Sequence, residues 1–249
     1  RPGQYEYEVE AEILYQFRKH GSEAPAYGSI VAGGANACVL HYRSNDAKLN
    51  DGDLLLIDAG CELDCYASDI TRTFPVNGKF SAAQQAVYEV VLNAQHAAIA
   101  ATKAGARFND PHDAAVNVLT QGLIDLKLLK MDFSEAIEKK AYSRFYMHRT
   151  GHWLGMDVHD CGSYRDPSAK LSDGVAPHTS RKLDPGMVLT IEPGLYIRPG
   201  KGVPAKFENI GIRIEDDAIV TAKGCEVYTE AAPKTVNEIH AVMKKKKQP

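Results

Sequence analysis

The sequence predicts an α+β fold with a mostly antiparallel sheet. Segments of strand character gather over residues 26–76 and 187–220, whereas segments of helical periodicity gather between these regions and at both ends. The chain lacks the regular alternation of strand and helix that produces a parallel sheet. Its 249 residues are enough for one large domain, and no break in composition divides them.

Residues 5–20 open the chain and are expected to form an amphipathic helix. Apolar residues recur there at every fourth position, with charged residues between them (Val9, Ile13 and Phe17). Apolar and small residues then alternate over residues 26–43 around Gly33-Gly34. That alternation predicts two strands joined by a turn.

A pair of strands is expected next along the chain. Residues 53–59 (DLLLIDA) form a continuous apolar run that has the length of a buried strand. Residues 69–76 (DITRTFPV) are its predicted partner, and the turn dipeptide Asn77-Gly78 ends it.

Helices are predicted for most of the middle of the chain. Ser81 is followed three residues later by Gln84, which resembles a capping box and predicts a helix over residues 81–103. The start signal Asn-Asp-Pro predicts a second helix over residues 109–129. Shorter helices are expected over residues 134–142 and 235–246.

Strand-like runs return over residues 187–192, 194–198 and 210–220. The segment before them, residues 161–186, is rich in Ser, Asp, Pro and Gly and has no clear periodicity. So long a segment is unusual for a plain connection, and it is expected to be a functional flap or a mobile insertion. His178 within it is interpreted as an exposed loop residue.

Composition excludes several classes of function. The net charge of −3 argues against a nucleic-acid binder, and the basic run Lys244–Lys247 is interpreted as a solvated helix end. No apolar run reaches the ~18 residues that a membrane span needs, and no secretory leader is expected. Five scattered cysteines, an odd number, are typical of reduced residues and favour a cytoplasmic protein.

One pattern occurs twice in the chain, over residues 51–60 and 184–194. In each copy a glycine turn leads six residues later, through apolar residues, to a carboxylate, which is Asp58 in the first copy and Glu192 in the second. A carboxylate at the end of an apolar strand loses its hydration unless it is paired or binds a cation. The repeat therefore favours a functional role for both acids.

A second acid follows each of these two, Asp69 in the first half and Glu215 in the second. Together the four carboxylates carry −4, which would balance two divalent cations about 3.5–4 Å apart. Such a pair of cations activates a bridging water as a nucleophile at neutral pH. Oxygen ligands favour hard cations such as manganese, with zinc or cobalt as alternatives.

One nitrogen ligand is expected in addition. Residues 147–160 hold three histidines, at positions 148, 152 and 159. A lone histidine is more often structural, but three beside four strand-end acids favour at least one metal ligand. Their spacing leaves open which of the three it is.

These segments together resemble the metallopeptidases of the pita-bread fold, and among them most closely aminopeptidase P. The resemblance is carried by residues 54–61 (LLLIDAGC), 68–80 (SDITRTFPVNGKF), 151–160 (GHWLGMDVHD), 189–197 (LTIEPGLYI) and 211–217 (GIRIEDD). It implies a curved, mostly antiparallel sheet covered by helices, with a pseudo-two-fold internal repeat. It also implies that residues 1–249 form a single catalytic domain, without the N-terminal domain found in that family.

The resemblance implies a role for each matching residue. The metal ligands would be Asp58, Asp69, His152, Glu192 and Glu215. Glu192 would also act as general base, and Arg213 would lie behind the bridging acids in the substrate site. His41, His148 and His159 would line the substrate and assist catalysis, with His159 as the donor to the scissile carbonyl oxygen or the proline nitrogen. Trp153 and Tyr196 are interpreted as packing residues.

The implied activity is metal-dependent hydrolysis of the bond between an N-terminal residue and a following proline. The implied partner is therefore a peptide with proline at its second position, and a homo-oligomer is an open expectation. A prolidase that cleaves Xaa-Pro dipeptides is the nearest alternative. A non-catalytic binding protein of the same fold, or a metal-free hydrolase of the creatinase kind, is disfavoured because all five ligand positions are filled.

Overall fold

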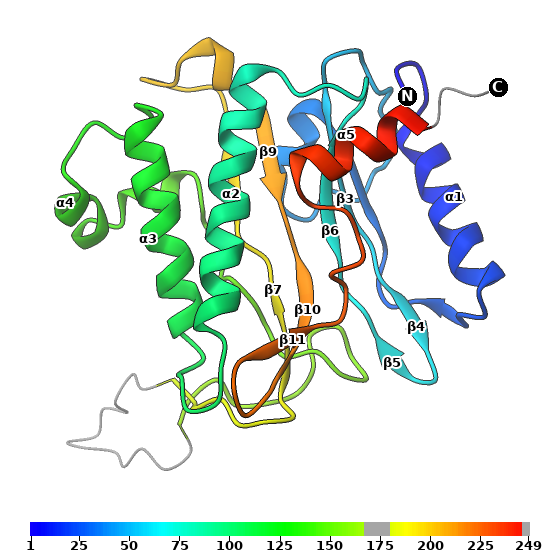
Figure 1. The fold of residues 1–249 in the computed structure, drawn as a ribbon. Coiled ribbons are helices and arrows are strands. Elements are labelled where there is room, and N and C mark those ends of the chain that lie inside the picture. The colour runs from blue at the N-terminus through cyan, green and yellow to red at the C-terminus, as the bar shows by residue number, and fades with distance from the viewer. Residues whose placement is uncertain (167–179, 246–249) are drawn as a thin grey trace.

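The computed structural model describes residues 1–166 and 180–245. Figure 1 shows strands in the centre of the molecule, with α2 and α3 on one side and α1 on the other. The α-helices are α1 (Glu6–Lys19), α2 (Ala82–Ala101), α3 (Asp110–Asp125), α4 (Phe133–Glu138) and α5 (Val236–Lys245). Within the described residues, no helix is long and apolar enough to cross a membrane.

The strands fall into two sets that correspond to the two halves of the chain. In the first half they are β1 (Ala24–Pro25), β2 (Ile30–Gly33), β3 (Leu54–Asp58), β4 (Cys61–Leu63), β5 (Tyr66–Ala67) and β6 (Thr71–Pro75). In the second half they are β7 (Val188–Ile191), β8 (Gly194–Ile197), β9 (Ile210–Arg213), β10 (Asp216–Val220) and β11 (Cys225–Val227). The pairings between these strands are antiparallel, as predicted.

The internal repeat is visible as two matching strand pairs. In the first half β3 pairs with β6, and Asp58 lies opposite Thr71. In the second half β7 pairs with β10, and Ile191 lies opposite Asp216. The glycines of the turns before β3 and β7 both have left-handed backbone, with φ of +87° at Gly52 and +93° at Gly186.

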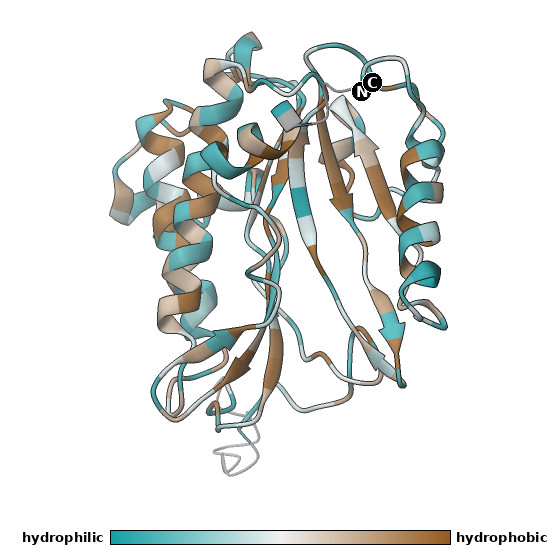
Figure 2. Ribbon diagram, turned by 45° about the vertical axis from the view of Figure 1, so that its right-hand side comes forward, coloured by the Kyte–Doolittle hydropathy of each residue, from teal (hydrophilic) through white to brown (hydrophobic). Residues whose placement is uncertain are grey.

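The two halves meet where β6 lies beside β9. The Thr73 hydroxyl donates to the Arg213 carbonyl oxygen at 3.0 Å and accepts from the Arg213 N–H at 3.3 Å. Helix α2 covers β9 and carries apolar residues such as Val87 and Val91 into the main core. Figure 2 shows hydrophobic residues along the strands and hydrophilic residues over most of α1, as expected for an amphipathic helix on the surface.

Tertiary packing overrides the prediction of two strands over residues 26–43. The chain forms β2 and then a 3₁₀ helix, Gly34–Cys38, in place of the second strand. This short helix packs against β9 at Gly211, where a Cβ atom would lie only 2.3 Å from the Ala37 carbonyl oxygen. The glycine that allows this contact is far away in sequence, so the local pattern could not predict it.

Two boundaries and one hairpin also differ from the expectations. The helix over residues 109–129 ends at Asp125, because Lys127 has left-handed backbone (φ 60°). The run over residues 210–220 is two strands, since β9 pairs with β8 and β10 pairs with β7. The hairpin of β4 and β5 was not predicted. Of the segment 161–186, residues 167–179, including His178, lie outside the described residues.

Candidate metal centre

A cavity of about 530 Å³ lies at the ends of the matching strand pairs. Every site residue expected from the sequence lines it, namely His41, Asp58, Asp69, His148, His152, His159, Glu192, Arg213 and Glu215. Asp58 ends β3 and Glu192 directly follows β7, whereas Asp69 precedes β6 and Glu215 lies between β9 and β10. The strand pairs therefore bring four acids from distant parts of the sequence to one place.

The side chains at the centre of the cavity are close enough to share a cation. Ligand atoms of Asp69, His152 and Glu215 all lie within 4.8 Å of one another. Glu192 adjoins this group, with its Oε1 atom 3.8 Å from Nε2 of His152. Asp58 adjoins it on the other side, because the Tyr27 hydroxyl lies 2.5 Å from an oxygen of Asp58 and 2.5 Å from an oxygen of Asp69.

The orientation of His152 suits a metal ligand. Its Nδ1 atom lies 3.0 Å from the Trp153 carbonyl oxygen, so this nitrogen is the one that carries the proton and donates. Its Nε2 atom points at Asp69, with 3.4 Å to Oδ2, and offers its lone pair to a cation whenever this nitrogen carries no proton. A backbone acceptor that fixes the tautomer in this way is the usual support of a metal-binding histidine.

The other two histidines of the segment have different surroundings. His148 contacts the Tyr196 hydroxyl through Nε2 at 2.8 Å, and burial together with the charge of Arg213 lowers its pKa to about 3. His159 packs edge-on against the His152 ring at 4.2 Å between centroids, and burial and His152 lower its pKa. Both rings are therefore neutral at physiological pH, and only His152 belongs to the close group with Asp69 and Glu215.

The electrostatics of the acids fit the binding of cations. Burial raises the pKa of Glu192 to about 8, and it also raises the pKa of Asp69 and that of Glu215. Each of these acids also faces the negative charge of its neighbours, and the Arg213 guanidinium forms its ion pair with the fourth acid, Asp58. Divalent cations would offset both costs, so this set of side chains fits a metal site.

Several supporting residues have no signal in the sequence. Tyr27 contacts two of the acids, and Thr71 donates from its hydroxyl to Oε2 of Glu215 at 2.6 Å. Tyr196 is buried, as expected of a packing residue, but its hydroxyl also accepts from Arg213 at 2.8 Å. Trp153 is a packing residue as expected, in contact with Phe108. Single tyrosines and threonines are too common in a sequence to be recognised as parts of a site.

Comparison with known proteins agrees with this geometry. The model of metallopeptidase family M24 matches residues 1–222. The chain belongs to metallopeptidase family M24. Members of this family hold divalent metal ions, so the fit of the cavity to cations has a direct explanation.

Curated relatives of this M24 chain include Xaa-Pro aminopeptidases. It is 49% identical over 243 residues to the enzyme of Haemophilus influenzae, and the matched region covers 98% of this chain and 54% of that protein. It is 46% identical over 243 residues to the enzyme of Escherichia coli, and the matched region covers 98% of this chain and 53% of that protein. The chain therefore spans about half the length of the curated relatives it matches.

Solved structures confirm the fold of this M24 chain. It superposes on Pseudomonas aeruginosa aminopeptidase PepP with a TM-score of 0.92 and 57% identity, covering 98% of this chain and 53% of that one. It superposes on proline aminopeptidase P II from Yersinia pestis with a TM-score of 0.91 and 49% identity, covering 98% of this chain and 54% of that one. The expected α+β pita-bread fold is thus confirmed.

Proposed function

We propose that this chain is the catalytic domain of a metal-dependent Xaa-Pro aminopeptidase. The observation that carries the proposal is the cavity in which four strand-end carboxylates and His152 converge. The identity of 46–49% to curated Xaa-Pro aminopeptidases supports the substrate class. The substrate would be a peptide with proline at its second position.

The residues proposed to hold two divalent ions are Asp58, Asp69, His152, Glu192 and Glu215. Asp69 and Glu215 would bridge the ions, with Asp58 on one side and His152 and Glu192 on the other. The ions, when bound, would lower the pKa of a water molecule and polarise the substrate carbonyl group. Manganese, a cytoplasmic location and a homo-oligomer stay predictions.

Glu192 is proposed to accept a proton from the attacking water. Burial raises its pKa to about 8 in the metal-free protein, so its carboxylate holds a proton far more strongly than an exposed acid does. His148 lies beside it, with 3.7 Å between Nδ1 and Oε2 of Glu192. The hydrogen bond from Nδ1 of His148 to the Arg149 carbonyl oxygen, 2.7 Å long, would hold the neutral ring beside the bound peptide.

His41 and His159 are proposed to bind the peptide at the cavity wall together with Arg213. His159 would donate a hydrogen bond to the scissile carbonyl oxygen or to the proline nitrogen. A Xaa-Pro bond has no amide hydrogen, so a peptidase that relies on strand pairing with its substrate cannot hold it by that group. Side-chain donors such as these histidines do not need that hydrogen.

The test is turnover of an Xaa-Pro-Xaa tripeptide by metal-stripped protein, with and without added manganese. We expect release of the first residue only when metal is present, and a much smaller rate with an Xaa-Pro dipeptide. Glu192→Gln should abolish release, whereas Glu89→Gln on the exposed surface of α2 should not. Cleavage of the dipeptide alone would identify a prolidase, and bound metal without any cleavage would refute catalysis.

A further inference from the structure

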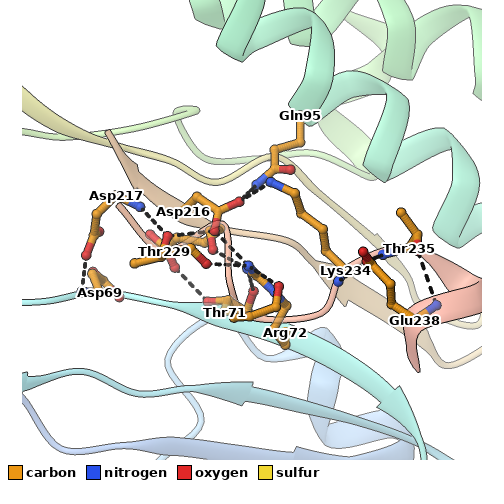
Figure 3. A network of polar contacts seen from close by, with 12 residues as sticks. Asp69, Thr71, Arg72, Gln95, Asp216, Asp217, Thr229, Lys234, Thr235 and Glu238 are labelled. Carbon is orange, nitrogen blue, oxygen red and sulfur yellow. Dashed lines mark hydrogen bonds and ion pairs between the residues drawn. The ribbon is translucent and has the colours of Figure 1, made fainter. Parts of the chain in front are cut away.

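A buried network of polar side chains lies behind the metal centre and lines no part of the cavity. It consists of Arg72, Gln95, Asp216, Thr229 and Lys234, and we refer to it as the Asp216 network (Figure 3). These residues come from β6, α2, β10, the segment after β11 and the segment before α5. The network thus ties four other parts of the chain to one carboxylate of β10.

Asp216 is fully buried and every one of its acceptor positions is used. Its Oδ1 atom accepts from Arg72 Nη2 at 2.7 Å and from the Thr229 hydroxyl at 2.6 Å. Its Oδ2 atom accepts from the Gln95 amide at 2.7 Å and from Lys234 Nζ at 2.6 Å. Arg72 and these other donors outweigh the effect of burial and lower the pKa of Asp216, so this carboxylate stays ionised in the folded protein.

Arg72 connects this carboxylate to Glu215. Its Nη1 atom donates to the Glu215 carbonyl oxygen at 2.5 Å, while Nη2 bonds Asp216. The backbone N–H of Glu215 donates to the Thr71 carbonyl oxygen at 3.0 Å. The peptide groups on both sides of Glu215 are therefore held by β6, and the planar guanidinium sets their distance from that strand.

The network also reaches Asp69. The backbone N–H of Asp69 donates to Oδ2 of Asp217 at 3.0 Å. The backbone N–H of Asp217 in turn donates to the Thr229 hydroxyl at 3.1 Å, and that hydroxyl donates to Asp216. Figure 3 shows this chain of contacts from Gln95 and Lys234 to Asp69.

Such support has a physical purpose in the metal centre. Asp69 and Glu215 lie in different halves of the chain, and their like charges repel each other when no cation lies between them. Their ligand atoms are nevertheless held within 4.8 Å together with that of His152. Because both strands are anchored through Asp216, the acids need little rearrangement when cations bind.

We propose that the ion pair of Arg72 and Asp216 positions Glu215 and Asp69 for metal binding. Arg72 and Asp216 are positioning residues, since neither lines the cavity. The inference rests on the proposed function, because it takes these two acids as the ligands that bridge the metal ions.

The test compares two cations that contact the same carboxylate. Arg72 and Lys234 both bond Asp216, but of the two only Arg72 bonds Glu215. Metal-stripped Arg72→Met and Lys234→Met proteins would be titrated with Co²⁺, with absorption spectra and calorimetry as readouts. We expect Arg72→Met to weaken Co²⁺ binding by about 10-fold to 100-fold, as loss of an outer support of a metal ligand typically does.

Lys234→Met is expected to lower the melting temperature as well, yet to leave the Co²⁺ dissociation constant within about threefold of wild type. Equal losses of affinity in both variants, or wild-type affinity in Arg72→Met, would overturn the proposal. Arg72→Lys keeps the charge but cannot reach both the Glu215 carbonyl oxygen and Asp216, so it provides the test if Arg72→Met does not fold. Wild-type Co²⁺ affinity in Arg72→Lys would overturn the proposal too. Wild-type protein that binds Co²⁺ but cleaves no Xaa-Pro peptide would refute the proposed function alone.

Discussion

Replacing Thr71 with valine removes a hydroxyl group that contacts two charged side chains of the cavity. This hydroxyl donates to Oε2 of Glu215 at 2.6 Å and accepts from Nε of Arg213 at 3.1 Å. Valine has nearly the shape of threonine, so the buried site is not emptied. The change therefore isolates the two hydrogen bonds from the packing of β6.

The magnitude follows from the charge of Arg213 and the protonation of Glu215, whose pKa burial raises in the metal-free protein. A hydrogen bond to a charged group contributes about 1.5–3 kcal/mol and a neutral one about 0.5–1.5 kcal/mol, so the loss of both bonds lowers the free energy of unfolding by about 2–6 kcal/mol. Thr73→Val is the matched control, because Thr73 lies two residues along the same strand and bonds only the backbone of Arg213. Two neutral bonds contribute about 0.5–1.5 kcal/mol each, so that control should lose about 1–3 kcal/mol.

The assay combines denaturant unfolding in the presence of a chelator with titration of Co²⁺ into the metal-free proteins. We expect Thr71→Val to bind Co²⁺ about 10-fold to 100-fold more weakly, because Glu215 loses the donor that orients it. Thr73→Val should bind Co²⁺ like the wild type. Wild-type affinity in Thr71→Val, or the same loss in both variants, would refute the argument.

Three further outcomes are expected. The metal-free protein should lose stability as the pH rises from about 6.5 to 8. Folding raises the pKa of Glu192 to about 8, so in this range the folded state keeps a proton that the unfolded chain has released. Thermal melts in EDTA measure this loss, and a rising melting temperature would contradict it. Glu6→Ala should lower the free energy of unfolding by about 2–6 kcal/mol, because the fully buried carboxylate accepts from the backbone N–H groups of Gly33 and Ala47. Urea unfolding would measure this loss, and the Co²⁺ affinity should stay unchanged. Ser81→Ala should cost about 1 kcal/mol by opening the capping box of α2, without effect on metal binding, and a silent mutation would contradict the cap.

The partly buried histidines His148 and His112 do not alter the sign of this pH effect. Burial lowers the pKa of His148 to about 3 and that of His112 to about 4, so these rings favour the folded state as the pH rises through their ordinary range, up to about 6.5. Above that range they are neutral in both states. Asp217, whose pKa burial raises to about 7, acts in the same direction as Glu192. The hydrogen bond to Asp69 and the charge of Glu192 outweigh burial and raise the pKa of His152, so this ring also loses a stabilising proton as the pH rises above about 6.5. The window from about 6.5 to 8 therefore reports Glu192, Asp217 and His152 of the cavity region together.

Local patterns predicted the elements whose stability is itself local. The capping box of Ser81 and Gln84 begins α2 as expected, and the apolar run before Asp58 is a buried strand. The predictions of secondary structure failed where the conformation of a segment depends on a contact with a distant part of the chain. The 3₁₀ helix after β2 depends on Gly211 of β9, and the break between β9 and β10 depends on their different partner strands.

The sequence by itself determined which residue types reach the ends of the repeated strands. An ionisable side chain at the end of an apolar run needs a partner, and the matching positions of Asp58 and Glu192 made that visible without a structure. The resemblance to a metallopeptidase family supplied the roles, and the family is confirmed.

Only the tertiary structure decided how these side chains are held. Of the three histidines, only His152 has a ligand atom within 4.8 Å of those of Asp69 and Glu215, and no spacing in the sequence encodes that grouping. The Asp216 network likewise joins residues that are far apart in the chain, from Arg72 to Lys234. Buried polar groups must find partners wherever folding brings them, so these contacts arise from the packing of strands and helices and have no local signature.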